Sequence, residues 1–74
     1  MQRRNMARAD VAPYKIEEML SDCEEAQHIP SQRGGPGYGK KDLDFLESLR
    51  EQFDDRGFVS EAQYKWLEDL WDRI

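Results

Sequence analysis

The chain has 74 residues, with 16 acidic and 11 basic side chains, a formal net charge of −5, one cysteine and one histidine. One cysteine excludes an internal disulfide, and one cysteine with one histidine cannot supply the four ligands of a structural zinc site. No apolar run reaches the roughly 18 residues of a transmembrane helix, so we expect no membrane partner. The basic N-terminus MQRRNMARAD has no apolar region after it, and the lone thiol suits a reducing compartment, so we expect a cytoplasmic protein.

Charge is segregated along the chain. Residues 1–15 and 30–41 each carry a net charge of +3, whereas residues 16–29 carry −5 and residues 42–74 carry −6. The expected helices are therefore acidic and the expected flexible parts basic. Acidic helices repel a phosphate backbone and favour basic protein partners. The alternative interpretation is that these charges form solvated faces that keep a small protein soluble.

The first ten residues lack apolar periodicity and predict a flexible basic arm. Residues 11–29 contain a first helix, expected from about Pro13 to Gln27, because apolar side chains recur there at helical spacing. Pro13 suits a first turn, Asp10 or a neighbour is expected to cap the helix, and Pro30 ends it. The expected buried face consists of Ala12, Ile16, Met19, Leu20, Cys23 and Gln27.

Residues 30–40, PSQRGGPGYGK, contain four glycines and two prolines and predict a linker without regular structure. A second helix is expected from about Lys41 or Asp42 to Asp55, with Gly57 as its left-handed stop. The acidic side chains of its first turn complement the helix dipole. Its apolar stripe consists of Phe45, Leu46, Leu49 and Phe53, with Leu43 at the margin.

The third helix opens with a capping box formed by Ser60 and Gln63. Val59 before the cap and Tyr64 after it predict a hydrophobic staple. Its apolar face consists of Tyr64, Leu67, Leu70, Trp71 and Ile74, with Trp66 on the shoulder beside Arg73. Residues 41–74 therefore predict an antiparallel helical hairpin, and the whole chain predicts an all-α fold.

Few residues suggest a catalytic, nucleotide-binding or metal-binding site. Cys23 and His28 are five positions apart, but Cys23 lies in the middle of an apolar stripe, where a cysteine is an inert small hydrophobe. The glycine-rich run 34–39 follows no strand and matches neither a P-loop nor a dinucleotide-binding fingerprint. The carboxylates lack the spacing of a calcium loop. We therefore expect no enzymatic activity, no metal and no cofactor.

A glycine turn between two helices also occurs in DNA-binding helix–turn–helix motifs. A recognition helix presents basic and amide side chains to DNA, whereas the third helix is mostly acidic. Binding of nucleic acid is therefore an alternative function only through the flexible segments, with the helices dimerising. The candidate residues for it are Arg3, Arg4, Arg8, Arg33, Lys40 and Lys41.

Aromatic side chains are more numerous than a pair of helices can bury: Phe45, Phe53, Phe58, Tyr64, Trp66 and Trp71. Either they pack on the first helix and complete a three-helix core, or some of them, Trp66 first, form an exposed patch. Tryptophan and tyrosine are frequent anchors of protein interfaces. The candidate partner-binding residues are Tyr64, Trp66, Glu68, Asp69, Trp71 and Arg73.

The run DFLESLREQFDDRGFVSEAQYKWLEDLWDR resembles a hairpin that recurs in small phage-encoded proteins. The matching residues are Phe45, Ser48, Leu49, Gln52, Gly57, Ser60, Gln63, Leu67 and Leu70. The resemblance implies a docking module without catalytic activity, one that binds a host enzyme of nucleic-acid metabolism in the host-cell cytoplasm. We therefore expect a protein-binding inhibitor or adaptor with a basic protein partner, acting as a partial DNA mimic. A structural subunit of a larger assembly and a homodimer are further alternatives.

Overall fold

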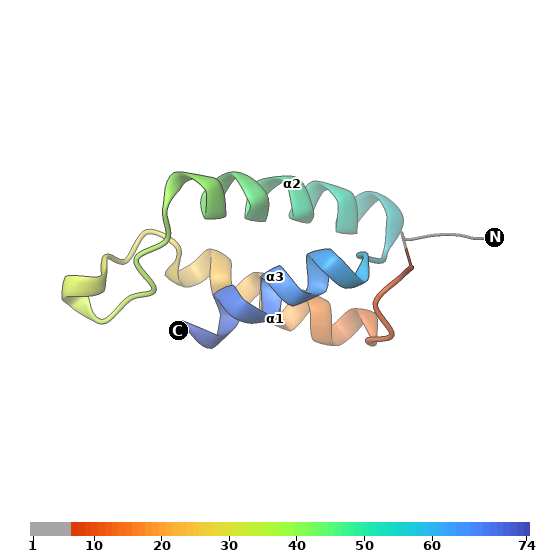
Figure 1. Ribbon diagram of the computed structural model, residues 1–74, viewed down its shortest axis with the longest axis horizontal. Helices are drawn as coiled ribbons and strands as arrows, with labels where there is room; N and C mark the ends of the chain where they lie inside the picture. The colour runs from red at the N-terminus through yellow and green to blue at the C-terminus, as the bar shows by residue number, and fades with distance from the viewer. Residues whose placement is uncertain (1–6) are drawn as a thin grey trace.

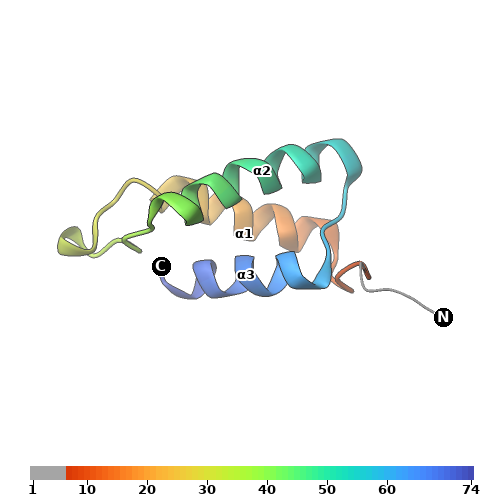
Figure 2. The same ribbon diagram turned by 45° about the horizontal axis from the view of Figure 1, so that its top comes forward.

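The computed structural model describes residues 7–74. Over these residues the chain forms α1 (Pro13–Ala26), a short 3-10 turn η1 (Ser31–Arg33), α2 (Lys40–Arg56) and α3 (Glu61–Asp72). The helices pack side by side, with α2 antiparallel to the other two (Figures 1 and 2). The predicted all-α fold is confirmed, and the hairpin of α2 and α3 packs on α1 as a three-helix bundle.

The start of α1 differs from the expected one. Ala12 occupies the N-cap position and makes no side-chain cap hydrogen bond, so the predicted side-chain cap by Asp10 or a neighbour is wrong. Asp10 lies two residues before the N-cap, too early to reach the free N–H groups of the first turn. Pro13 begins the helix, because its missing N–H is not needed there and its ring fixes a helical φ.

The turn between α2 and α3 is built as its sequence predicts. Gly57 adopts φ 79°, and its N–H donates to the Phe53 carbonyl at 2.7 Å. Ser60 Oγ accepts from the N–H of Gln63 at 3.1 Å, and Gln63 Oε1 accepts from the N–H of Ser60 at 2.8 Å. Gln63 also exchanges two side-chain hydrogen bonds with Gln52 of α2. The capping box therefore starts α3 and also joins it to α2.

The core draws on all three helices. Its buried members are Ile16, Met19, Leu20, Cys23, Leu46, Leu49, Phe53, Val59, Leu67 and Leu70. Half-buried Tyr38, Phe45, Tyr64 and Trp71 pack around it, so most of the aromatic surplus completes the bundle. The predicted face of α1 is confirmed for its four central residues.

The segments that sequence analysis expected to be flexible are partly tied to the bundle. The N–H of Ala9 donates to the carbonyl of Val59, and the N–H of Glu61 donates to the carbonyl of Ala7, both at 2.9 Å. The linker contains η1, which was not expected, and its Tyr38 hydroxyl donates to the Leu70 carbonyl at 2.7 Å. The ends of the arm and of the linker are thus held against α3.

Candidate functional site

Trp66 is the large aromatic residue that the bundle leaves accessible on the hairpin. Its ring stacks on Phe45 of α2, with centroids 3.9 Å apart and an interplanar angle of 18°. The indole Nε1 donates to Asp42 Oδ1 at 3.3 Å, and 41% of the residue stays exposed. One ring face is therefore covered, and the side chain is fixed at both its ring and its N–H.

Charged side chains surround this ring. Asp42 accepts hydrogen bonds from Trp66 and from Arg73, the latter at 3.4 Å, although its own side chain is only 17% exposed. Arg73 also pairs with Asp69 at 3.4 Å, and its guanidinium carbon lies 5.9 Å from the centre of the Tyr38 ring. We call Asp42, Phe45, Trp66, Asp69 and Arg73 the Trp66 surface.

The six predicted partner-binding residues do not form one patch. Trp66, Asp69 and Arg73 share the side of α3 that meets α2, because they recur at spacings of three and four. Trp71 instead faces α1, where its Nε1 donates to Asp22 Oδ2 at 3.0 Å and Lys15 Nζ lies 4.2 Å from its ring centre. Tyr64 and Glu68 belong to the same side as Trp71 by helical spacing.

The described segments that carry basic residues of the alternative function lie at opposite ends of the bundle: the chain before α1 lies beside the α2–α3 turn, whereas η1 and the start of α2 lie at the other end (Figure 1). Arg8 places its guanidinium carbon 3.9 Å from the centre of the Phe58 ring, beside the α2–α3 turn. Arg33 belongs to η1, and Lys40 and Lys41 begin α2. The fold therefore forms no single basic patch from them over residues 7–74, and Arg3 and Arg4 lie outside the described residues.

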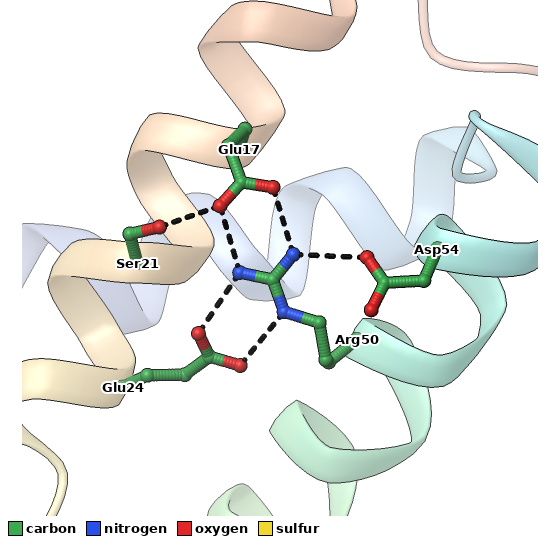
Figure 3. Close-up of polar contacts among 5 residues, drawn as sticks. All are labelled: Glu17, Ser21, Glu24, Arg50 and Asp54. Atoms are coloured by element: carbon green, nitrogen blue, oxygen red, sulfur yellow. Dashed lines mark hydrogen bonds and ion pairs between the residues drawn. The ribbon is translucent and has the colours of Figure 1, made fainter.

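An ion-pair cluster that sequence analysis missed joins α1 to α2 (Figure 3). Arg50 donates to both carboxylate oxygens of Glu17 and to both of Glu24, at 2.8 to 3.0 Å, and to Asp54 at 3.1 Å. The hydrogen bonds from Arg50 and from Ser21 lower the pKa of Glu17 from 4.5 to about 2. The spacing of Glu17 and Glu24, seven apart on one helix face, was the available signal.

The one thiol of the chain is buried. Cys23 lies in the core beside the Tyr38 hydroxyl, and burial raises the pKa values of both groups. His28 stands exposed after the end of α1. Over the described residues no three His, Cys, Asp or Glu side chains lie close enough together to hold a metal ion.

Comparison of the chain with models of protein families, with curated proteins and with solved structures found no match. The resemblance to small phage hairpin proteins therefore stays a prediction from the sequence. None of the helices of residues 7–74 has the length and apolar character needed to cross a membrane.

Proposed function

We propose that this chain is a non-enzymatic protein-binding modulator, an inhibitor or adaptor that docks on its partner through the Trp66 surface. The observation that carries the proposal is the exposure of Trp66, 41%, in a side chain held by a stack on Phe45 and a hydrogen bond to Asp42. Burial of a tryptophan at the centre of an interface is a frequent source of binding energy. This side chain is already ordered, so docking costs little rotamer entropy.

The partner in this proposal has a basic surface. The chain carries a net charge of −5, and Asp69 stands exposed beside the ring. Such a distribution steers a basic partner and speeds its association. A basic surface of this kind on a nucleic-acid enzyme normally holds nucleic acid, so the protein competes with that nucleic acid as a partial mimic of its charge.

The test is capture of a partner from host-cell lysate by the tagged protein, compared with two aromatic variants. Trp66→Ala removes the anchor, whereas Tyr14→Ala removes an aromatic side chain that is 78% exposed at the start of α1. One stoichiometric protein lost with Trp66→Ala and kept with Tyr14→Ala is the expected result. Circular dichroism of both variants shows that each keeps its helices.

The captured protein, once purified, is titrated with wild type, Trp66→Ala and Asp69→Asn. We expect the first substitution to weaken binding by about tenfold or more, since interface tryptophans contribute on the order of 2 kcal/mol. Competition with DNA or RNA on the purified partner tests the mimicry. Equal affinity of wild type and Trp66→Ala would contradict the proposal. Recovery of nucleic acid in place of protein, with steep salt dependence, would favour the basic-arm alternative.

A further inference from the structure

A second surface lies on the other side of α3, where the C-terminal ends of α1 and α3 meet. A groove of about 590 Å³ opens there. Its apolar lining comes from Ala26, Ile29, Trp71 and Ile74. This volume is in the range of pockets that accept large side chains or small ligands. The groove shares no residue with the Trp66 surface.

Two apolar residues of the groove, Ile29 and Trp71, are held in place. Ile29 is 40% exposed, yet its N–H donates to the Ala26 carbonyl at 2.9 Å. The linker folds back on it so closely that a Cβ on Gly35 would collide with its carbonyl oxygen and side chain. Trp71 is fixed by its hydrogen bond to Asp22. The apolar contacts that Ile29 and Trp71 offer are therefore preformed, and an occupant that uses them pays little ordering cost.

Carboxylates surround this apolar lining. Asp22, Glu25 and Asp72 line the groove, and Glu25 and Asp72 are exposed. Within residues 7–74 none of these three carboxylates forms an ion pair. All the ion pairs found there are made by other carboxylates. One cation lies nearby, since Lys15 Nζ is 4.2 Å from the centre of the Trp71 ring, and Asp22 already accepts from Trp71 Nε1. The three carboxylates outnumber that cation, so an acidic occupant would be repelled, whereas lysine or arginine side chains beside an apolar group would meet the carboxylates of Glu25 and Asp72.

We propose that this groove binds a partner-protein segment in which a large apolar side chain is flanked by lysine or arginine. The apolar side chain lies against Ile29, Trp71 and Ile74, and the flanking cations pair with Glu25 and Asp72. Because the charges are complementary, we expect a segment of this kind to bind more tightly than a neutral or acidic one. The inference goes beyond the Trp66 surface and does not depend on it, since the two surfaces lie on opposite flanks of α3.

The experiment uses the full chain with the Trp66→Phe substitution, which keeps an aromatic ring on Phe45. Trp71 is then the only tryptophan, since the chain has two, and its emission reports the groove. The probes are three synthetic peptides of equal length: an amphipathic leucine–lysine peptide, the same pattern in leucine and glutamate, and the same pattern in serine and lysine. We expect saturable quenching or a blue shift with the leucine–lysine peptide alone.

Two double variants in the same background test the contacts. Glu25→Gln with Asp72→Asn removes the free carboxylates and is expected to weaken binding of the leucine–lysine peptide about fivefold, since exposed ion pairs contribute only modestly to affinity. Asp55→Asn with Glu61→Gln removes equal charge near the α2–α3 turn, away from the groove, and is expected to leave the affinity nearly unchanged. Ile29→Ser tests the apolar lining and is expected to weaken binding as well.

Several results would overturn the proposal. The first is equal binding of the leucine–lysine peptide to the two double variants, which would mean attraction to net charge alone. Another is equal binding of the leucine–glutamate or serine–lysine peptide. A third is a concentration-dependent change of Trp71 emission without peptide, with dimers in sedimentation equilibrium, which would make a second copy the occupant. Because Trp66 is already replaced, each of these leaves the proposed function standing.

Discussion

Arg50 uses all five of its guanidinium N–H groups, four of them to join α2 to Glu17 and Glu24 of α1 and the fifth to reach Asp54 of its own helix. Its side chain is only 23% exposed. Two bidentate carboxylates hold it, the geometry in which ion pairs of arginine are strongest. Hydrogen bonds to Glu17 and Glu24 raise the pKa of Arg50 further above its ordinary value. Single exposed pairs contribute little to stability, but a guanidinium shared among three carboxylates has a fixed geometry.

Replacing Arg50 with methionine should lower the free energy of unfolding by about 1–2 kcal/mol, because Glu17, Glu24 and Asp54 are then left facing one another. Chemical denaturation measures the change. Arg56→Met is the matched control, since Arg56 makes one exposed pair, at 4.0 Å to Asp55, and should cost less than about 0.5 kcal/mol. Equal costs for the two substitutions would show that the cluster adds nothing beyond surface charge.

The free energy of unfolding should depend on pH through the ionisation of Glu17. Its pKa in the folded protein is about 2, below the ordinary 4.5, so the folded state favours the ionised carboxylate. The stabilisation is therefore complete above pH 4.5 and is lost as the pH falls toward 2. We expect the stability difference between wild type and Glu17→Gln to be constant at neutral pH and to shrink in that window. A difference unchanged down to pH 2 would contradict this.

At the scale of elements, substitution of Gly57 and of Gly39 by alanine compares a glycine of left-handed conformation with one of ordinary φ. Nothing lies within 4 Å of a Cβ built on either glycine, but Gly57 has φ 79° and Gly39 has φ −84°. Gly57→Ala should therefore cost about 1–2 kcal/mol from backbone conformation alone. Gly39→Ala should cost less, because its φ suits any residue and only the N-cap preference for glycine over alanine is lost. Thermal unfolding of the two variants compares them, and similar losses would show that the turn tolerates a side chain.

The elements whose signals are local could be predicted from the sequence, and those that depend on distant partners could not. The capping box of Ser60 and Gln63 and the stop at Gly57 use contacts within four residues, so their pattern is visible in the chain. Tyr38 finds its carbonyl partner 32 residues away, and Arg50 reaches Glu17 across 33. The glycine-rich sequence of the linker therefore did not predict the hydrogen bond that holds it to α3.

The sequence indicated which aromatic side chain of the hairpin is exposed, but not how the candidate residues are arranged around it. The position of Trp66 on the shoulder of the apolar face indicated partial exposure, and the structure shows it. That Trp71 faces α1 while Trp66 faces α2 depends on the placement of α1 beside α3, a contact between distant parts of the chain. The sequence pattern assigned no role to Ile29, because its place in a groove depends on how the linker folds back on it.

At the scale of the whole molecule, the bundle has one core that no pair of its helices completes. Four of its buried residues come from α1, and the remainder from α2, α3 and the turn between them. A chain of this size gains roughly 3–5 kcal/mol of net stability. We therefore expect the hairpin of α2 and α3 to unfold together with α1 in a single transition, as small single domains do.

The substitution Leu20→Ala tests this coupling, because Leu20 lies on α1 and is fully buried. It should cost about 3 kcal/mol and so remove most of the stability. In a Trp71→Phe background, Trp66 is the only tryptophan and senses α2 and α3 through its stack on Phe45. We expect its fluorescence midpoint in denaturant to fall as far as that of helical circular dichroism. Tyr14→Ala, an exposed change on the same helix, should move neither. If Trp66 kept its midpoint while circular dichroism lost the signal of one helix, the hairpin would be stable without α1, and docking could proceed on the hairpin alone.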